Sequence, residues 1–157
     1  MNLEALKSTA VAMVGNGKGI LAADESTPTI GKRFDTINTE STAESRRRYR
    51  EMLFTAEGAN KYIGGVILFD ETLRQSTSDG VPFPKYLEGL GIAPGIKVDS
   101  GAKSLAAFEG ETVTEGLDGL RERLIEYYSL GARFAKWRAV INVNDSLPSE
   151  FCIRANS

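Results

Sequence analysis

Two hydrophobic periodicities alternate along the chain. Apolar residues recur at helical spacing from Leu3 to Val14, and Gly15 ends that segment. Short apolar runs rich in branched residues follow at intervals, as expected of strands buried on both faces. The predicted strands are Ile20–Ala23, Gly65–Phe69, Gly95–Asp99 and Arg133–Val140. Such alternation is typical of repeated βα units and predicts an α/β fold.

Start and stop signals place the remaining helices. Ser41–Glu44 has the spacing of a capping box and predicts a helix start. Thr114–Gly131 is predicted to be a second helix that ends at its glycine. Ser26–Pro28 reads as a polar turn after the first strand, and Ser146–Glu150, with a proline just inside it, predicts a short final helix.

The number of predicted strands limits the architecture. Four strands with their helices fill the 157 residues, whereas a closed eight-fold (β/α) barrel typically takes about 250 residues. No low-complexity tract or linker divides the chain. The pattern therefore predicts one α/β domain that looks like half of a larger architecture.

Charged residues stand at the predicted strand ends, where α/β enzymes place their sites. Period-two alternation puts Lys97 and Asp99 on one face of the third strand, and Lys136 and Arg138 on one face of the fourth. Burial lowers the pKa of an amine unless a partner such as Asp24 compensates. The set suits Schiff-base chemistry or a doubly anionic substrate, although a structural ion pair is the alternative for each residue taken alone.

Other polar motifs are given structural interpretations. Gly15–Gly19 follows a helix and precedes a strand, the reverse of a phosphate-binding loop. Arg46–Arg50 is expected to form a solvated helix face, although one arginine could turn inward to a phosphate. Asp70, Glu71 and Asp99 are expected to stop strands or cap turns.

Composition excludes several kinds of site. The chain has no histidine and Cys152 is its one thiol, which rules out a His/Cys zinc centre, a Ser-His-Asp triad and a disulfide framework within it. Neither a metal nor a cofactor is expected. The net charge, 19 − 21 = −2, argues against nucleic-acid or anionic-membrane partners. Without a signal-like start or an apolar run of about 20 residues, a cytoplasmic setting is expected.

Several segments resemble one family, the class I fructose-bisphosphate aldolases. They are Gly17–Thr27, Ile63–Phe69, Gly95–Asp99, Gly116–Leu120 and Phe134–Arg138. The resemblance implies an enzyme of glycolysis and gluconeogenesis with an α/β fold of the (β/α) TIM-barrel type. Residues 1–157 would form one domain with only the first four βα units present, a half barrel. Such an enzyme reversibly cleaves fructose 1,6-bisphosphate to dihydroxyacetone phosphate and glyceraldehyde 3-phosphate without a metal, usually as a homotetramer.

The resemblance also assigns roles to residues of this chain. It implies that Asp24 assists carbon–carbon bond cleavage, and that Lys97 and Lys136 support the reacting region and the phosphate. The implied substrate-binding residues are Thr29, Arg33, Arg46 and Arg138.

The family's Schiff-base lysine and main acid/base glutamate lie on the sixth and fifth strands, which have no counterpart among the four predicted here. Three hypotheses remain open: an aldolase that needs those later strands, a non-catalytic sugar-phosphate-binding or self-associating half-barrel module, and a residual enzyme in which Lys97 or Lys136 forms the imine. Because a half barrel leaves strand edges unpaired, a homo-oligomer or a complementing carboxy-terminal half is expected.

Overall fold

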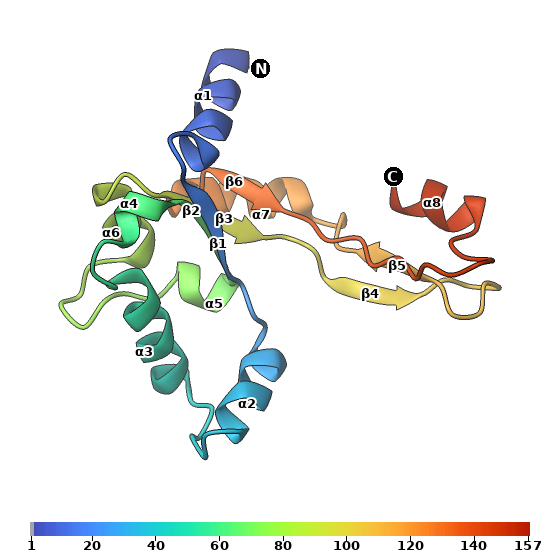
Figure 1. The fold of residues 1–157 in the computed structure, drawn as a ribbon, viewed down its shortest axis with the longest axis horizontal. Helices are drawn as coiled ribbons and strands as arrows, with labels where there is room; N and C mark the ends of the chain where they lie inside the picture. Colours follow the sequence, from blue (N-terminus) through green and yellow to red (C-terminus); the bar gives the residue numbers. More distant parts are fainter. Residues whose placement is uncertain (1) are drawn as a thin grey trace. The chain divides into compact units, whose positions relative to one another are not determined.

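The computed structural model describes residues 2–157, which divide into two compact units (Figure 1). The first unit runs through Lys97 and includes Ile125–Ala135. The second comprises Val98–Leu124 and Lys136–Ser157. Because the division passes through one helix and one strand, each of those two elements contributes residues to both units.

The elements alternate as the hydrophobic pattern predicts. The helices are α1 (Leu3–Val14), α2 (Thr27–Asp35), α3 (Ala43–Phe54), α4 (Ala59–Tyr62), α5 (Asp70–Leu73), α6 (Phe83–Gly89), α7 (Leu120–Ser129) and α8 (Glu150–Asn156). The strands are β1 (Gly19–Ala23), β2 (Ile63–Leu68), β3 (Ala93–Lys97), β4 (Gly101–Ser104), β5 (Thr112–Glu115) and β6 (Phe134–Lys136). None of the helices described in residues 2–157 has the length and apolar character to cross a membrane.

A four-stranded sheet carries the fold, in the order β1-β2-β3-β6. β1, β2 and β3 pair in parallel, with Ala22, Ile67 and Gly95 in register across them. The predicted α/β fold with a parallel sheet is confirmed. Within residues 2–157 the sheet ends at β1 and β6 and does not close into a barrel.

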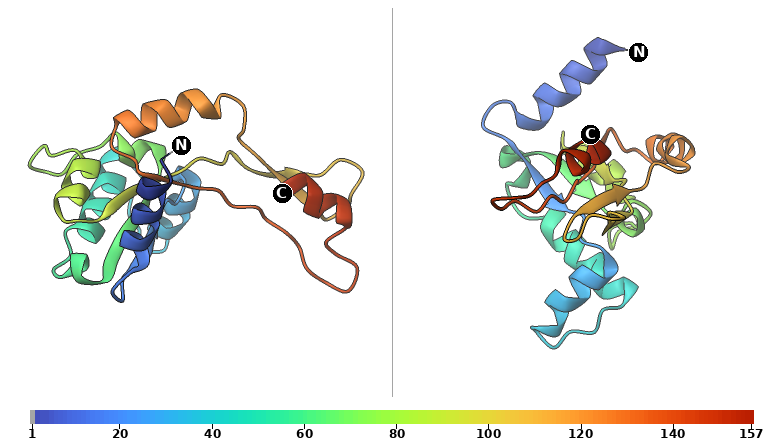
Figure 2. Two further views of the ribbon diagram at one scale, coloured as in Figure 1. Left: turned by 90° about the horizontal axis from the view of Figure 1, so that it is seen from above. Right: turned by 90° about the vertical axis from the view of Figure 1, so that its right-hand side faces the viewer.

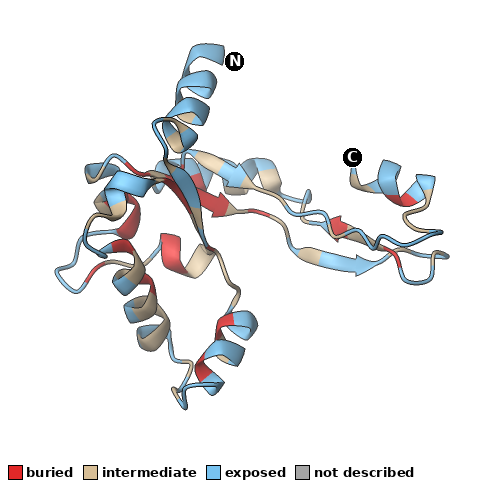
Figure 3. Cartoon of the chain, viewed as in Figure 1, coloured by how far each residue is buried: buried red, intermediate tan, exposed pale blue. Residues whose placement is uncertain are grey.

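One face of the central strands is fully buried. Val66, Leu68 and Ile96 are at most 1 % exposed, and Figure 3 shows the buried colour on these strands. On the opposite face the sheet is lined by glycines. A Cβ on Gly95 would lie 2.3 Å from the ring of Phe134, so only glycine lets that ring lie on the strand. Both faces of β3 are therefore covered, which explains its continuous apolar sequence.

Helix α1 contacts the sheet through its carboxyl end. A Cβ on Gly64 would lie 2.4 Å from the carbonyl oxygen of Met13, which shows how closely the helix backbone approaches β2. The predicted apolar stripe is otherwise uncovered in this structure, because Leu3 and Leu6 are each 62 % exposed and no residue of Leu3–Val14 is buried.

Two local predictions in the first unit are wrong. The expected polar turn at Ser26–Pro28 is the start of α2, since proline fits the first turn of a helix, where its missing N–H costs nothing. The capping box of α3 is formed one residue later than expected: Ser45 N donates to Thr42 Oγ1 at 3.0 Å and Thr42 N donates to Ser45 Oγ at 2.9 Å.

The second unit is built on an antiparallel hairpin that the sequence pattern did not predict. β4 pairs with β5 in the register Gly101↔Glu115, so the predicted helix start at Thr114 is wrong and α7 begins only at Leu120. The predicted strand at Arg133–Val140 shortens to β6. Beyond Lys136 the chain is held by the side chains of β5, because Thr114 Oγ1 donates to the carbonyl of Arg138 at 2.9 Å.

The predicted carboxy-terminal helix is present as α8, which packs on β5 (Figure 2). Asn156 completes this contact: its Oδ1 accepts from Thr114 N at 3.0 Å and its Nδ2 donates to Thr112 O at 2.9 Å. A side-chain amide thus takes both hydrogen bonds that a further strand would make there.

A buried carboxylate fixes the start of α8. Glu111, 3 % exposed, accepts from the backbone N of Ser149 at 2.7 Å and from its hydroxyl at 2.6 Å. The Ser149 hydroxyl is the main reason why the pKa of Glu111 lies below its usual value.

Acidification is therefore expected to loosen α8. A depressed carboxyl pKa contributes stability above the unfolded pKa, about 4.3, which is lost as pH falls through the lower folded pKa. Amide hydrogen exchange of Ser149, followed by NMR from pH 6 to pH 3, should accelerate beyond the intrinsic pH dependence. Glu111→Gln should remove this excess, and an equal excess in that variant would contradict the assignment.

Candidate functional site

Asp24 and Lys97 end two strands of the same sheet. Asp24 directly follows β1, Lys97 is the last residue of β3, and both are partly buried. Since Ala22 and Gly95 are in register across Ile67, continuing each strand by two residues places Asp24 and Lys97 at the same edge and on the same face. The structure thus brings together two of the three predicted catalytic residues.

Lys136 and Arg138 belong to the second unit. Lys136 is the last residue of β6, the strand next to β3 in the sheet order, and its carbonyl accepts from Val98 N at 3.1 Å. Arg138 lies beyond the strand, where its carbonyl accepts the hydroxyl of Thr114 and its side chain is exposed. The two residues therefore do not share one strand face as predicted.

Thr29 and Arg33 lie one turn apart on α2, the helix that follows β1. The Thr29 hydroxyl hydrogen-bonds that of Ser26 at 3.0 Å, within the first turn. Arg33 donates through Nη1 to Oε1 of Glu25, the residue after Asp24. Because positions i and i+4 share one face of a helix, a hydroxyl and a guanidinium face the same way close to the end of β1.

Glu25 also contacts a buried arginine that the sequence analysis did not single out. Arg50 on α3 is 2 % exposed, and its Nη2 donates to the Glu25 carbonyl at 3.0 Å. The same nitrogen lies 3.0 Å from Glu25 Oε2. Burial lowers the pKa of Arg50, and the Glu25 carboxylate opposes that effect. The only sign of its burial in the sequence is that Arg50 directly follows Tyr49, a residue of the apolar stripe of α3.

Arg46 is engaged with the protein. Its Nε and Nη2 donate to the two carboxylate oxygens of Glu71 at 2.8 and 2.6 Å, and its Nη1 donates to the Ser41 carbonyl at 2.8 Å. The hydrogen bonds to Glu71 raise the pKa of Arg46 above its usual value. An incoming phosphate would have to replace this bidentate carboxylate.

The basic run on α3 is mostly paired and not solvated. Arg47 donates to Glu44 at 2.8 Å and to Glu51 at 2.7 Å, with its side chain only 18 % exposed. Together with the pairs made by Arg46 and Arg50, these contacts overturn the expected solvated face. Arg46 and Arg50 bind α3 to distant segments through Glu71 and Glu25, whereas both counter-ions of Arg47 lie on α3 itself.

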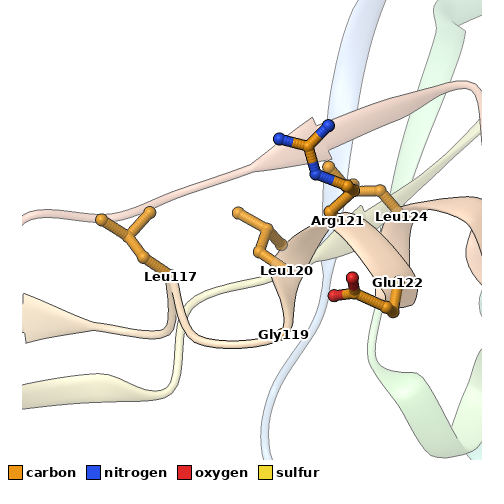
Figure 4. Close-up of a pocket in the computed structure, with 6 residues that line it drawn as sticks. All are labelled: Leu117, Gly119, Leu120, Arg121, Glu122 and Leu124. Carbon is orange, nitrogen blue, oxygen red and sulfur yellow. The ribbon is translucent and has the colours of Figure 1, made fainter.

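A shallow hollow lies in the second unit at the start of α7 (Figure 4). Its volume is about 530 Å³, and it contains none of the predicted site residues. The lining residues are Leu117, Gly119, Leu120, Arg121, Glu122 and Leu124. Figure 4 shows the side chains of Arg121 and Glu122 leaving the helix in different directions, so they do not converge on a ligand.

Comparisons with known proteins point to one family. The family model for fructose-bisphosphate aldolase class-I matches residues 5–157. A probable class 1 fructose-bisphosphate aldolase of Xanthomonas campestris is 62 % identical over 157 residues, which is all of this chain and 47 % of that protein. The cytoplasmic isozyme of Spinacia oleracea is 56 % identical over 141 residues, 90 % of this chain and 40 % of that protein.

A solved structure shares the fold. Fructose-bisphosphate aldolase from Plasmodium falciparum, crystallised with TRAP and a small-molecule inhibitor, superposes with a TM-score of 0.93 at 50 % identity, over 97 % of this chain and 44 % of that one. The fold is therefore that of an α/β protein with a parallel sheet, close to the aldolase structure. The chain belongs to the class I fructose-bisphosphate aldolase family. It spans about half the length of the relatives that it matches.

Proposed function

We propose that this chain provides the amino-terminal half of a class I fructose-bisphosphate aldolase, as one domain with the first four βα units of the barrel. The reaction is the reversible, metal-independent cleavage of fructose 1,6-bisphosphate to dihydroxyacetone phosphate and glyceraldehyde 3-phosphate, a step of glycolysis and gluconeogenesis. The observation that carries the proposal is the placement of Asp24 and Lys97 at one edge and on one face of the parallel sheet.

The two predicted strand-end residues have complementary tasks. When the carbon–carbon bond breaks, the hydroxyl group on the carbon that leaves loses its proton. Asp24 supplies a carboxylate that accepts or stabilises this proton. Lys97 supplies an ammonium group that holds oxygen atoms of the substrate. Lys136 is proposed to do the same from β6. The imine-forming lysine is assigned to the complementing half.

Phosphate binding is assigned to a hydroxyl and three guanidinium groups. Arg33 presents a planar fork suited to a phosphate monoester, and Thr29 adds a hydroxyl one turn earlier on α2. Arg46 and Arg138 are further proposed phosphate-binding residues, with Arg46 exchanging the Glu71 carboxylate for the substrate.

We assign two further properties to the working protein, a partner and a cellular setting. β1 is an outer strand with Ile20 43 % exposed, and the sheet continues no further on that side in residues 2–157. A carboxy-terminal half, or a second copy of the chain, would pair with this edge. The names of plant relatives include a cytoplasmic isozyme, which supports a cytoplasmic setting.

The decisive experiment combines two halves. The chain is mixed with the carboxy-terminal half of the 62 % identical Xanthomonas campestris protein, and fructose 1,6-bisphosphate cleavage is measured alongside light scattering. Borohydride reduction with dihydroxyacetone phosphate, read by peptide mass spectrometry, locates the imine. Cleavage by the mixture, with the adduct on the added half, is expected.

The separate halves are the controls. A folded complex that binds fructose 1,6-bisphosphate without cleaving it would instead support a non-catalytic sugar-phosphate-binding module. A stable adduct on Lys97 or Lys136 in the chain alone would assign the imine-forming lysine to this half instead. A well-folded, dilution-stable monomer with little dye-accessible apolar surface would contradict the need for a partner.

A further inference from the structure

Glu25 lies between an exposed arginine, Arg33, and a buried one, Arg50. Its Oε1 accepts from Nη1 of Arg33, whose side chain is 56 % exposed. Its Oε2 lies 3.0 Å from Nη2 of Arg50, whose side chain is 2 % exposed. The carboxylate is itself 12 % exposed, so it links a solvent-facing guanidinium to a buried one. Only the first of these links is an aligned hydrogen bond between the two side chains.

The buried arginine has donors that remain unused. Nε and Nη1 of Arg50 are buried, and no atom of residues 2–157 accepts a hydrogen bond from either. Oε2 of Glu25 is likewise buried and accepts none within the described chain. A buried donor without a partner costs about 1–3 kcal/mol, and more when it is charged. A carboxylate that turned fully to Arg50 would form a bidentate pair through Nη2 and one of the two unused donors, and Oε2 would then accept a hydrogen bond.

The hydrogen bond from Arg33 occupies Oε1, which leaves only Oε2 next to Arg50. The present arrangement is therefore a compromise in which one carboxylate serves two cations. If another anion took Arg33, Glu25 could give both of its oxygens to Arg50. The backbone would not have to move, because Arg50 Nη2 already holds the Glu25 carbonyl at 3.0 Å. Asp24, the preceding residue, would keep its place.

We infer that Glu25 is an internal competitor for the phosphate group that Arg33 binds, and that Arg50 is the positioning residue that receives Glu25 when phosphate arrives. This inference rests on the proposed role of Arg33 in substrate binding. Arg50 does not touch the phosphate. It lowers the cost of freeing Arg33, and it selects a dianion able to displace a carboxylate over weaker anions.

Substitutions of Glu25 and Arg50 are expected to change the affinity for phosphate in opposite directions. Inorganic phosphate is titrated into the 157-residue chain by isothermal calorimetry. Glu25→Gln removes the competitor and should tighten binding about tenfold, equivalent to about 1.4 kcal/mol. Arg50→Met leaves Glu25 no alternative partner and should weaken binding about fivefold. In the double variant the weakening should disappear. Glu44→Gln, which removes a carboxylate from Arg47 on the exposed face of α3, should leave the affinity unchanged.

A second measurement needs no substitution, because loss of a buried charge partner can itself unfold a protein. Arginine Nε–Hε signals are followed by ¹⁵N NMR as phosphate is added to the unaltered chain. The Arg50 signal should shift together with that of Arg33, although Arg50 makes no phosphate contact. Movement of the Arg33 signal alone would overturn the inference and leave the proposed function intact.

The calorimetric outcomes separate the two proposals. Equal or weaker phosphate binding by folded Glu25→Gln, with normal binding by the unaltered chain, would overturn the competition but not the phosphate site. Binding by Glu25→Gln that is measurable when the unaltered chain shows none would support the competition in its strongest form. No phosphate binding by either protein would overturn both the competition and the proposed role of Arg33.

Discussion

Replacing Asp24 by alanine is expected to slow fructose 1,6-bisphosphate cleavage about 10³-fold in an enzyme assembled from this chain and a carboxy-terminal half. The expectation follows from the usual contribution of a positioned acid or base, about 10²–10⁴-fold. The residue lies beyond the end of β1 and contributes no apolar burial, so folding should be intact. Initial rates and thermal melts of the mixed halves measure the two effects separately.

An exposed aspartate provides the matched control for this experiment. Asp79 lies exposed in the loop between α5 and α6, and Asp79→Ala should leave turnover unchanged. If Asp24→Ala retained turnover within threefold of the unaltered mixture, Asp24 would be no more than a strand-end charge.

Replacing Gly64 by alanine is expected to detach the end of α1 from the sheet. The new Cβ would lie 2.4 Å from the Met13 carbonyl oxygen and 2.6 Å from that of Ala12, and both are backbone atoms that no rotamer change can move. Overpacking of this kind costs about 1–3 kcal/mol. The free energy of unfolding, from urea titration, should fall by that amount, and amide exchange in α1 should accelerate.

Gly89→Ala is the corresponding control for this clash. A Cβ at Gly89 meets nothing within 4 Å, at the end of α6, so its effect on the free energy of unfolding should be slight. Equal stability of the two variants would show that α1 can shift without cost.

The parallel sheet could be predicted because its strands are buried on both faces, and such strands have continuous apolar sequences. Hairpin β4–β5 could not, since most of its residues are polar or small and its pairing depends on the chain reversing between Ser104 and Thr112. Helix α2 was missed for a different reason. Its first residues, threonine and proline, are equally common in turns. Only the burial of Ile30 and Phe34 favours the helix.

The positions of the candidate site residues could be predicted to the same extent as the strands that carry them. Asp24 and Lys97 follow from strand ends and alternation, and register alone joins them. The counter-ions do not follow from any local rule. Arg46 and its partner Glu71 are 25 residues apart, as are Arg50 and Glu25, so a run of arginines in the sequence gives no indication of which of them are buried.

The side chain of Asn156 has a consequence for how the protein avoids aggregation. Exposed strand edges are templates on which other chains can pair and grow. By occupying the amide of Thr114 and the carbonyl of Thr112, Asn156 makes the open side of the hairpin unavailable to a foreign strand. A single amide side chain therefore protects the hairpin against intermolecular β-pairing. The residues of α8 between Ser149 and Asn156 hold that side chain in position.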